Sequence, residues 1–491
     1  MTRFHRIPCE AKNGKEQCDN PREWSRARRL LFVFGACVAP FAVIYGNSIY
    51  VASIPGVIQR FEVSTTVGIS PISIYCLGQT IGPPITTSFS EFFGRKWIMR
   101  LSIPLALIFT VVGGAAKNFE TLAVCRFLSS LAISPAGTVC VGIVNDLWDV
   151  ALSKTGTFLA LIVALMNLLP AAIGPSTGAA LVATTGDWRW TFWLNAIVLG
   201  FIVLLTFPVP ETYQPYRVKA HNKRNGTTAP SVDYKKTLRE AFTRPVHMLF
   251  TEPIVFPTSL AAAILQAILF CWYIAYPVIF ERVYQFTEKE QGLAFLPILL
   301  GNVLGIVVIG ICDKAKYQKA RVAAMETGAK VESELRLYAA CVGAIGTPIS
   351  IFWLAWTAKP SIHWIAPMLS GILFGLSHAT VAVSPSMFPH PSALFNQYCI
   401  QLSYNIYKND IYGAEYGASA FAGEVMLRYL LSAATPLFWV QVMDALDIGW
   451  STSVLGFVSL TLVPLPWVFF RYGPYLRSKS GYVPVDVEVR V

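Results

Sequence analysis

Charged residues are scarce in this sequence. They account for 14% of the 491 residues, whereas hydrophobic residues account for 54%. About a quarter of the residues in a soluble domain are charged, so the composition excludes an ordinary soluble protein. The sequence also contains no Gly-x-x-x-x-Gly-Lys-Ser/Thr phosphate-binding loop. That absence excludes a self-contained ATP-driven pump and leaves secondary transporters, channels, and membrane-embedded enzymes or receptors.

The ten cysteines form no Cys-x-x-Cys pair. Two of them, Cys9 and Cys18, lie in an N-terminal tail that is expected on the reducing side of a membrane, where disulfides are rare. Cys37, Cys76, Cys125, Cys140, Cys271 and Cys341 lie within apolar runs and behave as small hydrophobic residues. Neither a disulfide framework nor a metal site is expected, and no cofactor is predicted. No histidine cluster or Ser/His/Asp set falls within the apolar runs, so the chain is predicted not to be an enzyme.

Long apolar runs recur along the chain. A run of about 20 apolar residues can cross the hydrocarbon core of a bilayer. Such runs fall into two groups of six, near residues 30–53, 67–88, 97–115, 121–145, 156–182 and 190–209, and near residues 254–279, 292–312, 336–357, 363–386, 417–441 and 449–470. The predicted fold is an all-α integral membrane protein with twelve transmembrane helices in two six-helix bundles. One large transporter architecture consists of two such halves, with its binding site at mid-depth between them.

Basic residues are distributed unevenly between the two sides of the predicted spans. With the N-terminus in the cytoplasm, the outer loops contain only six of the 39 basic residues, namely Arg60, Lys117, Arg189, Arg282, Lys289 and Lys359. Cytoplasmic loops hold an excess of Lys and Arg, so both termini are predicted to be cytoplasmic. This topology accounts for much of the net charge of +11, and no nucleic-acid partner is expected.

Five segments follow from this topology. Cytoplasmic tails are predicted at residues 1–28 and 472–491, and six-helix bundles at residues 29–210 and 251–471. The stretch 211–250 is polar and is predicted to be a cytoplasmic linker between the bundles.

A Gly-Pro pair lies inside the fifth apolar run. Pro175 removes one backbone donor and is expected to kink the helix, while Gly174 and Gly178 form a small-xxx-small face that lets another helix approach closely. Gly301 and Gly305 form a similar face on the eighth run. The sequence predicts that the two glycine faces pack against each other across the interface between the halves and seal the outer side.

The short turn between the second and third runs is rich in charge. Its sequence is Ser90-Glu91-Phe92-Phe93-Gly94-Arg95-Lys96. Gly94 permits a tight turn, and Arg95 can reach Asp146 at the inner end of the fourth run. One interpretation is a charged latch, made of Glu91, Gly94, Arg95, Lys96 and Asp146, that holds the cytoplasmic side closed. The alternative is a simple anchor of basic residues at the membrane surface.

Several short motifs occur in an order that resembles the major facilitator superfamily, and within it the fungal twelve-span drug:proton antiporters. The stretch from Gly78-Gln79-Thr80-Ile81-Gly82-Pro83 to Gly94-Arg95-Lys96 is similar to the cytoplasmic signature of that group. Gly174-Pro175-x-x-Gly178, followed by Trp188-Arg189-Trp190-Thr191-Phe192-Trp193, is similar to its antiporter signature. Further matches are Pro210-Glu211-Thr212-Tyr213, Glu334-Leu335-Arg336-Leu337 and Pro436-Leu437-Phe438. The resemblance covers about residues 40–480, and residues 389–401 differ from it as an insertion.

Charged residues within the predicted spans include Arg126, Glu424 and Arg428. Such a residue is costly in a bilayer and is by default a functional candidate. The resemblance implies that Arg126 takes part in proton coupling; the alternative is that it pairs with a backbone carbonyl or extends to the outer surface. Glu424 and Arg428 lie four residues apart on one helix face. Either they neutralise each other, or Glu424 carries the proton.

Polar and aromatic residues are predicted to line a cavity between the halves. Aromatic rings hold flat or cationic ligands by stacking and cation–π attraction, although Tyr and Trp are also common at membrane interfaces. The candidates are Asn47, Tyr50, Asn167, Gln266, Tyr273, Tyr276, Asn302 and His378.

Together these features predict a secondary active transporter that exports small amphipathic compounds in exchange for protons. Its partners would be a small-molecule substrate, protons and the lipid bilayer, and a monomer is expected. The resemblance implies polyamines and organic acids as alternative cargoes. A non-transporting membrane sensor is a further alternative, for which longer signalling tails would be expected. The plasma membrane is favoured over the vacuolar membrane.

Overall fold

The computed structural model describes residues 21–148, 154–214, 216–218, 234–312, 338–382 and 402–481. Regular structure in these residues is helical throughout, without a strand. The candidate insertion at residues 389–401 lies outside the described residues.

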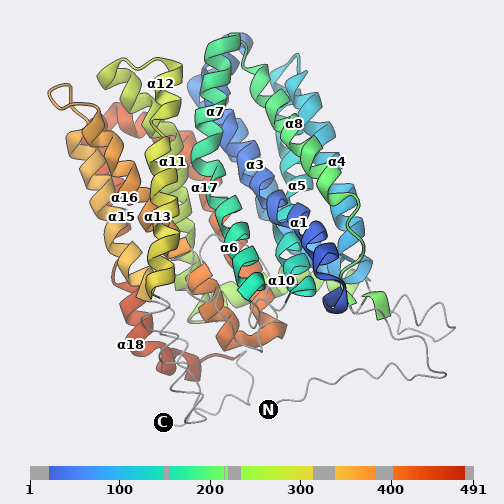
Figure 1. Cartoon of the computed structure of the whole chain (residues 1–491). Coiled ribbons are helices and arrows are strands. Elements are labelled where there is room, and N and C mark those ends of the chain that lie inside the picture. Colours follow the sequence, from blue (N-terminus) through green and yellow to red (C-terminus); the bar gives the residue numbers. More distant parts are fainter. Residues whose placement is uncertain are drawn as a thin grey trace, which may run out of the picture.

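Long helices that run up and down the molecule form the first half of the chain (Figure 1). Apolar length predicts their positions well, since α4 and α8 coincide with the runs at residues 97–115 and 190–209. The elements are η1 (Pro21–Glu23), α1 (Arg26–Ser48), η2 (Ile49–Ser53), α2 (Ile54–Phe61), α3 (Thr65–Phe93), α4 (Arg95–Gly114), α5 (Phe119–Leu147), α6 (Lys154–Leu168), α7 (Pro170–Thr185) and α8 (Arg189–Thr206).

The second half repeats this arrangement beside the first (Figure 1). Its elements are α10 (Tyr234–Thr251), α11 (Val255–Tyr284), α12 (Glu288–Leu293), α13 (Leu296–Cys312), α15 (Tyr338–Thr357), α16 (Ile365–Ala382), α17 (Leu402–Leu460) and α18 (Leu465–Ser478). The polar stretch predicted as a linker therefore ends in a helix, α10, which packs against α3, α11 and α17.

Two helix boundaries differ from the expectation. The fifth run is divided into α6 and α7 at Leu169, immediately before Pro170, whereas α7 continues through Pro175. The interruption falls at Pro170 because a proline at the first position of a helix leaves no donor unsatisfied. The eleventh and twelfth runs share α17, in which Asp447 has a left-handed backbone (φ 67°) between them.

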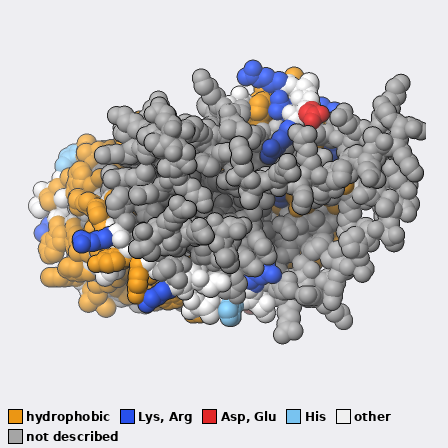
Figure 2. Space-filling view, turned by 90° about the horizontal axis from the view of Figure 1, so that it is seen from below, with side chains coloured by type: hydrophobic (Ala, Val, Ile, Leu, Met, Phe, Trp, Pro, Cys, Tyr) orange, Lys and Arg blue, Asp and Glu red, His pale blue; other side chains and the backbone are white. Residues whose placement is uncertain are grey.

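The outer surfaces of several helices are apolar in a regular pattern. On α4, the exposed residues Leu101, Leu105, Ile108 and Val112 are spaced by four, three and four positions and so form one stripe. Figure 2 shows hydrophobic side chains over much of the described flank of the molecule. An exposed apolar surface of this extent fits lipid rather than water.

Seven stretches among the described residues are long and apolar enough to cross a membrane. They are Arg26–Phe61, Arg95–Gly114, Phe119–Val144, Arg189–Thr206, Val255–Tyr284, Glu288–Val308 and Ser419–Phe469. The protein is therefore a multi-pass membrane protein, and the fold of its described residues is all-helical. The count of twelve spans and the cytoplasmic termini stay predictions.

The two ends of the bundle are distinct. We call the end of the bundle at which α1 begins and α18 finishes the proximal end, and the sequence predicts that it is cytoplasmic. The opposite end, where α12 lies, is the distal end (Figure 1). Polar contacts join the halves near the distal end. The hydroxyl of Ser176 on α7 donates to the carbonyl of Gly292 on α12 at 2.7 Å, and the hydroxyl of Thr66 on α3 lies 2.5 Å from the amide of Gln441 on α17.

A buried carboxylate lies between α10 and α11 at the proximal end. Glu252 is 3% exposed. It accepts hydrogen bonds from the hydroxyl of Tyr412 on α17 at 2.8 Å, from the hydroxyl of Ser480, and from the backbone N–H of Gly481 at 3.1 Å. Glu252 therefore holds the segment that follows α18 against the second half.

Candidate functional site

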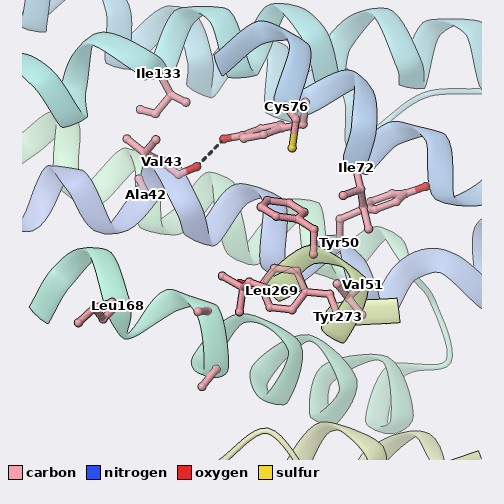
Figure 3. Close-up of a cluster of buried hydrophobic side chains, with 14 of the residues drawn as sticks. Ala42, Val43, Tyr50, Val51, Ile72, Cys76, Ile133, Leu168, Leu269 and Tyr273 are labelled. Atoms are coloured by element: carbon pink, nitrogen blue, oxygen red, sulfur yellow. Dashed lines mark hydrogen bonds between the residues drawn. The ribbon is translucent and has the colours of Figure 1, made fainter. Parts of the chain in front are cut away.

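A small central cavity lies between the two halves. Its volume is about 20 Å³, which is room for about one water molecule. Its wall comes from both halves and consists of Val43, Ile44, Asn47, Tyr75, Gln79, Asn167, Ala171, Gln266, Leu269, Phe270, Tyr273, His378 and Tyr429. Figure 3 labels three residues of this wall, Val43 from the first half and Leu269 and Tyr273 from α11. No substrate fits, so the structure is closed around its centre.

Five of the eight residues predicted for the cavity line it. They are Asn47, Asn167, Gln266, Tyr273 and His378, and all are nearly completely buried. Polar side chains buried at this depth cost free energy unless they are hydrogen-bonded. Their convergence on one cavity is what a site for a partly polar ligand requires.

The other three predicted residues lie outside the central cavity. The hydroxyl of Tyr50 donates to the carbonyl of Gly68 at 3.0 Å, and the hydroxyl of Tyr276 donates to the carbonyl of Met368 at 3.1 Å. The side-chain amide of Asn302 donates to the carbonyl of Leu168 at 3.3 Å, across the interface between the halves. In this structure these side chains join helices rather than face the cavity.

Four polar or aromatic residues of the cavity wall were not predicted. Tyr75 and Gln79 come from α3, Phe270 comes from α11, and Tyr429 comes from α17. Gln79 is the one amide side chain of the run at residues 67–88 and is 2% exposed, so the sequence did carry a signal for it. Tyr429 follows Arg428 directly, and nothing in the sequence distinguishes it from an ordinary interface aromatic.

Arg126 is buried beside the central cavity, with 4% of its surface exposed. Its guanidinium donates to the carbonyl of Gly46 at 2.5 Å and to the side-chain oxygen of Asn47 at 3.1 Å. The guanidinium carbon also lies 4.7 Å from the ring centroid of Tyr50 and 4.5 Å from that of Tyr75. Aromatic faces and a carbonyl thus stabilise a positive charge in direct contact with Asn47 of the cavity wall. Its role in proton coupling stays a prediction.

Glu424 and Arg428 are both completely buried in α17. The guanidinium carbon of Arg428 lies 4.9 Å from the ring centroid of Tyr429, which lines the central cavity. Arg428 is therefore one residue from the cavity wall. Two opposite charges on one buried helix face reduce the cost of burying either one, and this leaves both sequence-based interpretations of the pair open.

The predicted partner of Arg95 is in contact with it at the proximal end. The guanidinium Nε of Arg95 lies 2.9 Å from a carboxylate oxygen of Asp146, which also accepts a hydrogen bond from the Thr212 hydroxyl at 3.2 Å. Asp146 lies just beyond the apolar stretch Phe119–Val144, and burial raises the pKa of its carboxyl, although the Arg95 guanidinium acts in the opposite direction. The side chain of Glu91 lies outside the described residues. That this cluster acts as a latch stays a prediction.

A second carboxylate belongs to the same proximal cluster. Glu211 accepts the backbone N–H of Arg95 at 3.0 Å and that of Lys96 at 3.2 Å. These are orphan donors at the start of α4, where a negative charge is favourable. Gly94 precedes them with φ 83°, and a side chain there would collide with the Glu211 carboxylate. The sequence contained the Pro-Glu-Thr-Tyr motif, but it did not indicate that Glu211 closes this turn.

The predicted pairing of the two glycine faces is wrong. Gly174 and Gly178 on α7 face the end of α1 and η2: a Cβ at Gly178 would lie 2.9 Å from the Ala52 Cβ. Gly301 and Gly305 on α13 face α16, where a Cβ at Gly305 would lie 2.5 Å from the Ala379 Cβ. Both faces pack within their own half, because close approach requires small residues on one helix and does not specify the partner.

Gly292 on α12 makes the close contact of α7 with the second half. A Cβ at Gly292 would lie 2.5 Å from the Ala179 Cβ and 3.3 Å from the carbonyl oxygen of Pro175. The Gly-Pro region of α7 thus does reach the interface between the halves, through the short helix α12.

Comparison with known proteins agrees with this geometry. The family model described as Major Facilitator Superfamily matches residues 36–404. In the solved structures, the human organic anion transporter MFSD10 (TETRAN) has a TM-score of 0.62 at 14% identity, covering 91% of this chain and 100% of that chain. At that identity the likeness shows the fold alone.

Curated relatives extend over nearly the whole chain. The Efflux pump FUB11 of Gibberella moniliformis is 32% identical over 480 residues, which are 95% of this chain and 76% of that protein. The Polyamine transporter 4 of Saccharomyces cerevisiae is 31% identical over 516 residues, which are 97% of this chain and 74% of that protein. The Efflux pump FUBT of Fusarium oxysporum is 33% identical over 480 residues, with 95% and 76% covered.

Proposed function

This chain belongs to the major facilitator superfamily and is a membrane transporter rather than an enzyme, and on that premise we propose that it exports small amphipathic compounds in exchange for protons. The observation that carries the proposal is the central cavity, whose polar and aromatic wall comes from both halves. A site shared in this way is exposed to one side or the other when the halves rock against each other.

Two sets of contacts would control that rocking. At the proximal end, Arg95, Asp146 and Glu211 tie the start of α4 to the end of α5 and to the segment that follows α8. At the distal end, Ser176 and Gly292 hold α7 against α12. Because the central cavity holds no more than about one water in this structure, substrate entry requires one of the two ends to open.

Proton coupling is proposed to use the charges beside the cavity. Arg126 contacts Asn47 of the wall, Arg428 lies beside Tyr429, and Glu424 is buried four residues before Arg428 on the same helix. Glu424 is the proposed proton carrier, because it is the acid of this group and a carboxyl can exchange a proton once opening admits water. Arg126 would then hold the wall in place, and its positive charge would influence the binding of the substrate and of the proton alternately.

The cargo class has two candidates. The likeness to pumps named for efflux favours amphipathic metabolites or drugs, and the likeness to a protein named as a polyamine transporter favours polyamines as the second. A plasma-membrane location and a monomeric state belong to the same proposal.

Transport by purified protein in liposomes tests the proposal. With an acid interior, we expect uptake of a substrate dye as protons leave, and loss of uptake when a protonophore removes the gradient. The dye should carry a permanent charge, because weak bases accumulate in acid vesicles without any protein. Gradient-independent movement, or no movement across a broad panel of neutral, cationic and anionic compounds, would refute proton-coupled export.

A further inference from the structure

A second, larger cavity lies at the distal end between the halves. We call it the distal vestibule. Its volume is about 330 Å³, within the range of roughly 300–1,000 Å³ that is typical of small-molecule sites. Apolar side chains form opposite walls, with Val51 and Ile69 from the first half and Ile274 and Val278 from the second. The vestibule is therefore large and apolar enough for a ligand that the closed central cavity cannot hold.

The charge of the vestibule is negative. Its lining includes the carboxylates of Glu281, Glu288 and Asp444 and the guanidinium of Arg282. Arg282 lies 2.7 Å from Asp444, so this pair is neutral as a unit. Within the described part of the chain, Glu281 and Glu288 form no ion pair and leave two negative charges. The vestibule is therefore negative although the net charge of the whole chain is +11, and a negative cavity attracts cations.

Tyr273 lines both the central cavity and the distal vestibule. Figure 3 shows Tyr273 together with Leu269, which lines the central cavity, and Val51, which lines the vestibule. Its side chain is 2% exposed, and its hydroxyl has no hydrogen-bond partner among the residues that the structure describes. A buried hydroxyl without a partner is unfavourable. A ligand in the vestibule could supply that partner.

A second aromatic ring lies near Tyr273 in the vestibule wall. Phe295 lines the vestibule, and its ring centroid lies 6.3 Å from that of Tyr273. Ring faces at this position attract a cation as well as an aromatic ligand. Apolar walls, aromatic rings and two carboxylates without ion pairs are the combination that a lipophilic organic cation needs.

We propose that the distal vestibule is a second binding site, specific for amphipathic organic cations on their way to or from the central cavity, and that the Tyr273 ring separates the two sites. The cationic group lies near Glu281 and Glu288, and its aryl or alkyl groups pack against Ile69 and Val278. This inference rests on the proposed export function and names its substrate class.

Equilibrium binding to the purified full-length protein tests this site without transport. The probes are tetraphenylphosphonium, a permanent cation, and triphenylphosphine oxide, its neutral aryl counterpart. We expect Glu281→Gln with Glu288→Gln to weaken phosphonium binding about tenfold at low salt, because an exposed charge pair contributes up to about a factor of five, and less at high salt. Binding of the neutral compound should not change, which also shows that the variant is folded.

Glu290→Gln is the matched control. Glu290 lies on the same helix, α12, but caps Thr287 at 2.8 Å and does not line the vestibule among the described residues. A second measurement fixes the location: phosphonium should protect Val278→Cys from a thiol reagent. The inference is overturned if the parent protein does not bind phosphonium, if the double variant binds it as tightly as the parent, or if Glu290→Gln weakens binding equally. The liposome assay decides the export function separately, since binding and transport can fail independently.

Discussion

Gly292 provides the sharpest test of how the two halves close at the distal end. In Gly292→Val, the new Cβ would lie 2.5 Å from the Cβ of Ala179, whereas carbon atoms in contact are separated by about 3.5–4.0 Å. The overlap is about 1 Å, and the valine methyl groups extend it. Overpacking of this kind costs about 1–3 kcal/mol. The contact with α7 must loosen or the surrounding helices must move.

This cost should act on the closed arrangement alone. If α7 and α12 separate when the distal end opens, the penalty disappears in the open state. An energy of 1–3 kcal/mol then shifts the equilibrium toward the open state by a factor of about 5–150. The hydrogen bond from Ser176 to the Gly292 carbonyl, 2.7 Å in this structure, would be lost in the same step.

Thiol labelling can measure the shift. Ile69 lines the distal vestibule and is 2% exposed, so Ile69→Cys should react slowly with a bulky maleimide in the parent background and several-fold faster together with Gly292→Val. The parent without Ile69→Cys gives the background of the native cysteines. Gly200→Val is the matched control, because a Cβ there meets nothing within 4 Å. Unchanged labelling with Gly292→Val, or an equal rise with Gly200→Val, would refute the reasoning.

Three further predictions follow from the other contacts. Arg126→Ala should abolish uptake driven by a pH gradient in liposomes. Arg126→Lys should restore little of that uptake, because one ammonium group cannot reproduce the contacts of the guanidinium with Gly46, Asn47 and two aromatic rings. Full gradient-driven uptake by the alanine variant would rule out the coupling role. Asp146→Asn should lower the thermal unfolding midpoint, because it removes the carboxylate from a guanidinium side chain that is only 7% exposed, at a cost of up to about 3 kcal/mol. The same change at Asp187, whose pair with Arg189 is longer at 3.7 Å and more exposed, should have almost no effect, and equal midpoints for the two variants would contradict this. Gly178→Leu should reduce the yield of folded protein, measured by fluorescence size-exclusion chromatography, because it collides with Ala52 and Ile49 inside one half; a normal yield with blocked transport would instead support a role in alternation.

Apolar length and charge placement predict much of the fold. α4 begins at Arg95 and ends at Gly114, and the predicted run is at residues 97–115. The two agree because an apolar stretch of about 20 residues is the length of a helix that crosses the hydrocarbon core of a bilayer. The contact of Arg95 with Asp146 was also predictable. Both residues lie at the same end of neighbouring helices, and opposite charges at such ends have few other partners.

The orientation of the inner helices was not predictable in the same way. In α11, 83% of the most apolar 18-residue stretch is buried inside the protein, whereas in α4 the share is 39%. A helix that is buried on all sides has no polar face to mark the direction of the cavity. The sequence therefore could not separate Tyr273, which lines the cavity, from Tyr276, whose hydroxyl donates to Met368 on α16.

The helix that packs against the α7 glycines was the second feature that the sequence could not predict. Gly174 and Gly178 predict a close approach, yet the glycine that reaches α7 from the other half is Gly292, in a helix of six residues without a small-xxx-small motif. The contact depends on the loop that places α12 over α7. Loop geometry of this kind is set by the packed structure and not by a local pattern.

The anchoring of the chain beyond α18 by Glu252 has a practical consequence for handling the protein. A version shortened to end before Ser480 would remove two of the three donors to a carboxylate that is 3% exposed, leaving a buried charge with fewer hydrogen bonds, which is strongly unfavourable. Purification tags and fluorescent fusions should therefore follow Gly481 after a spacer, and protease sites should be placed beyond it. A tag fused directly after Lys479 would put foreign residues where Ser480 and Gly481 contact Glu252, and it would report on a protein that the fusion itself had destabilised.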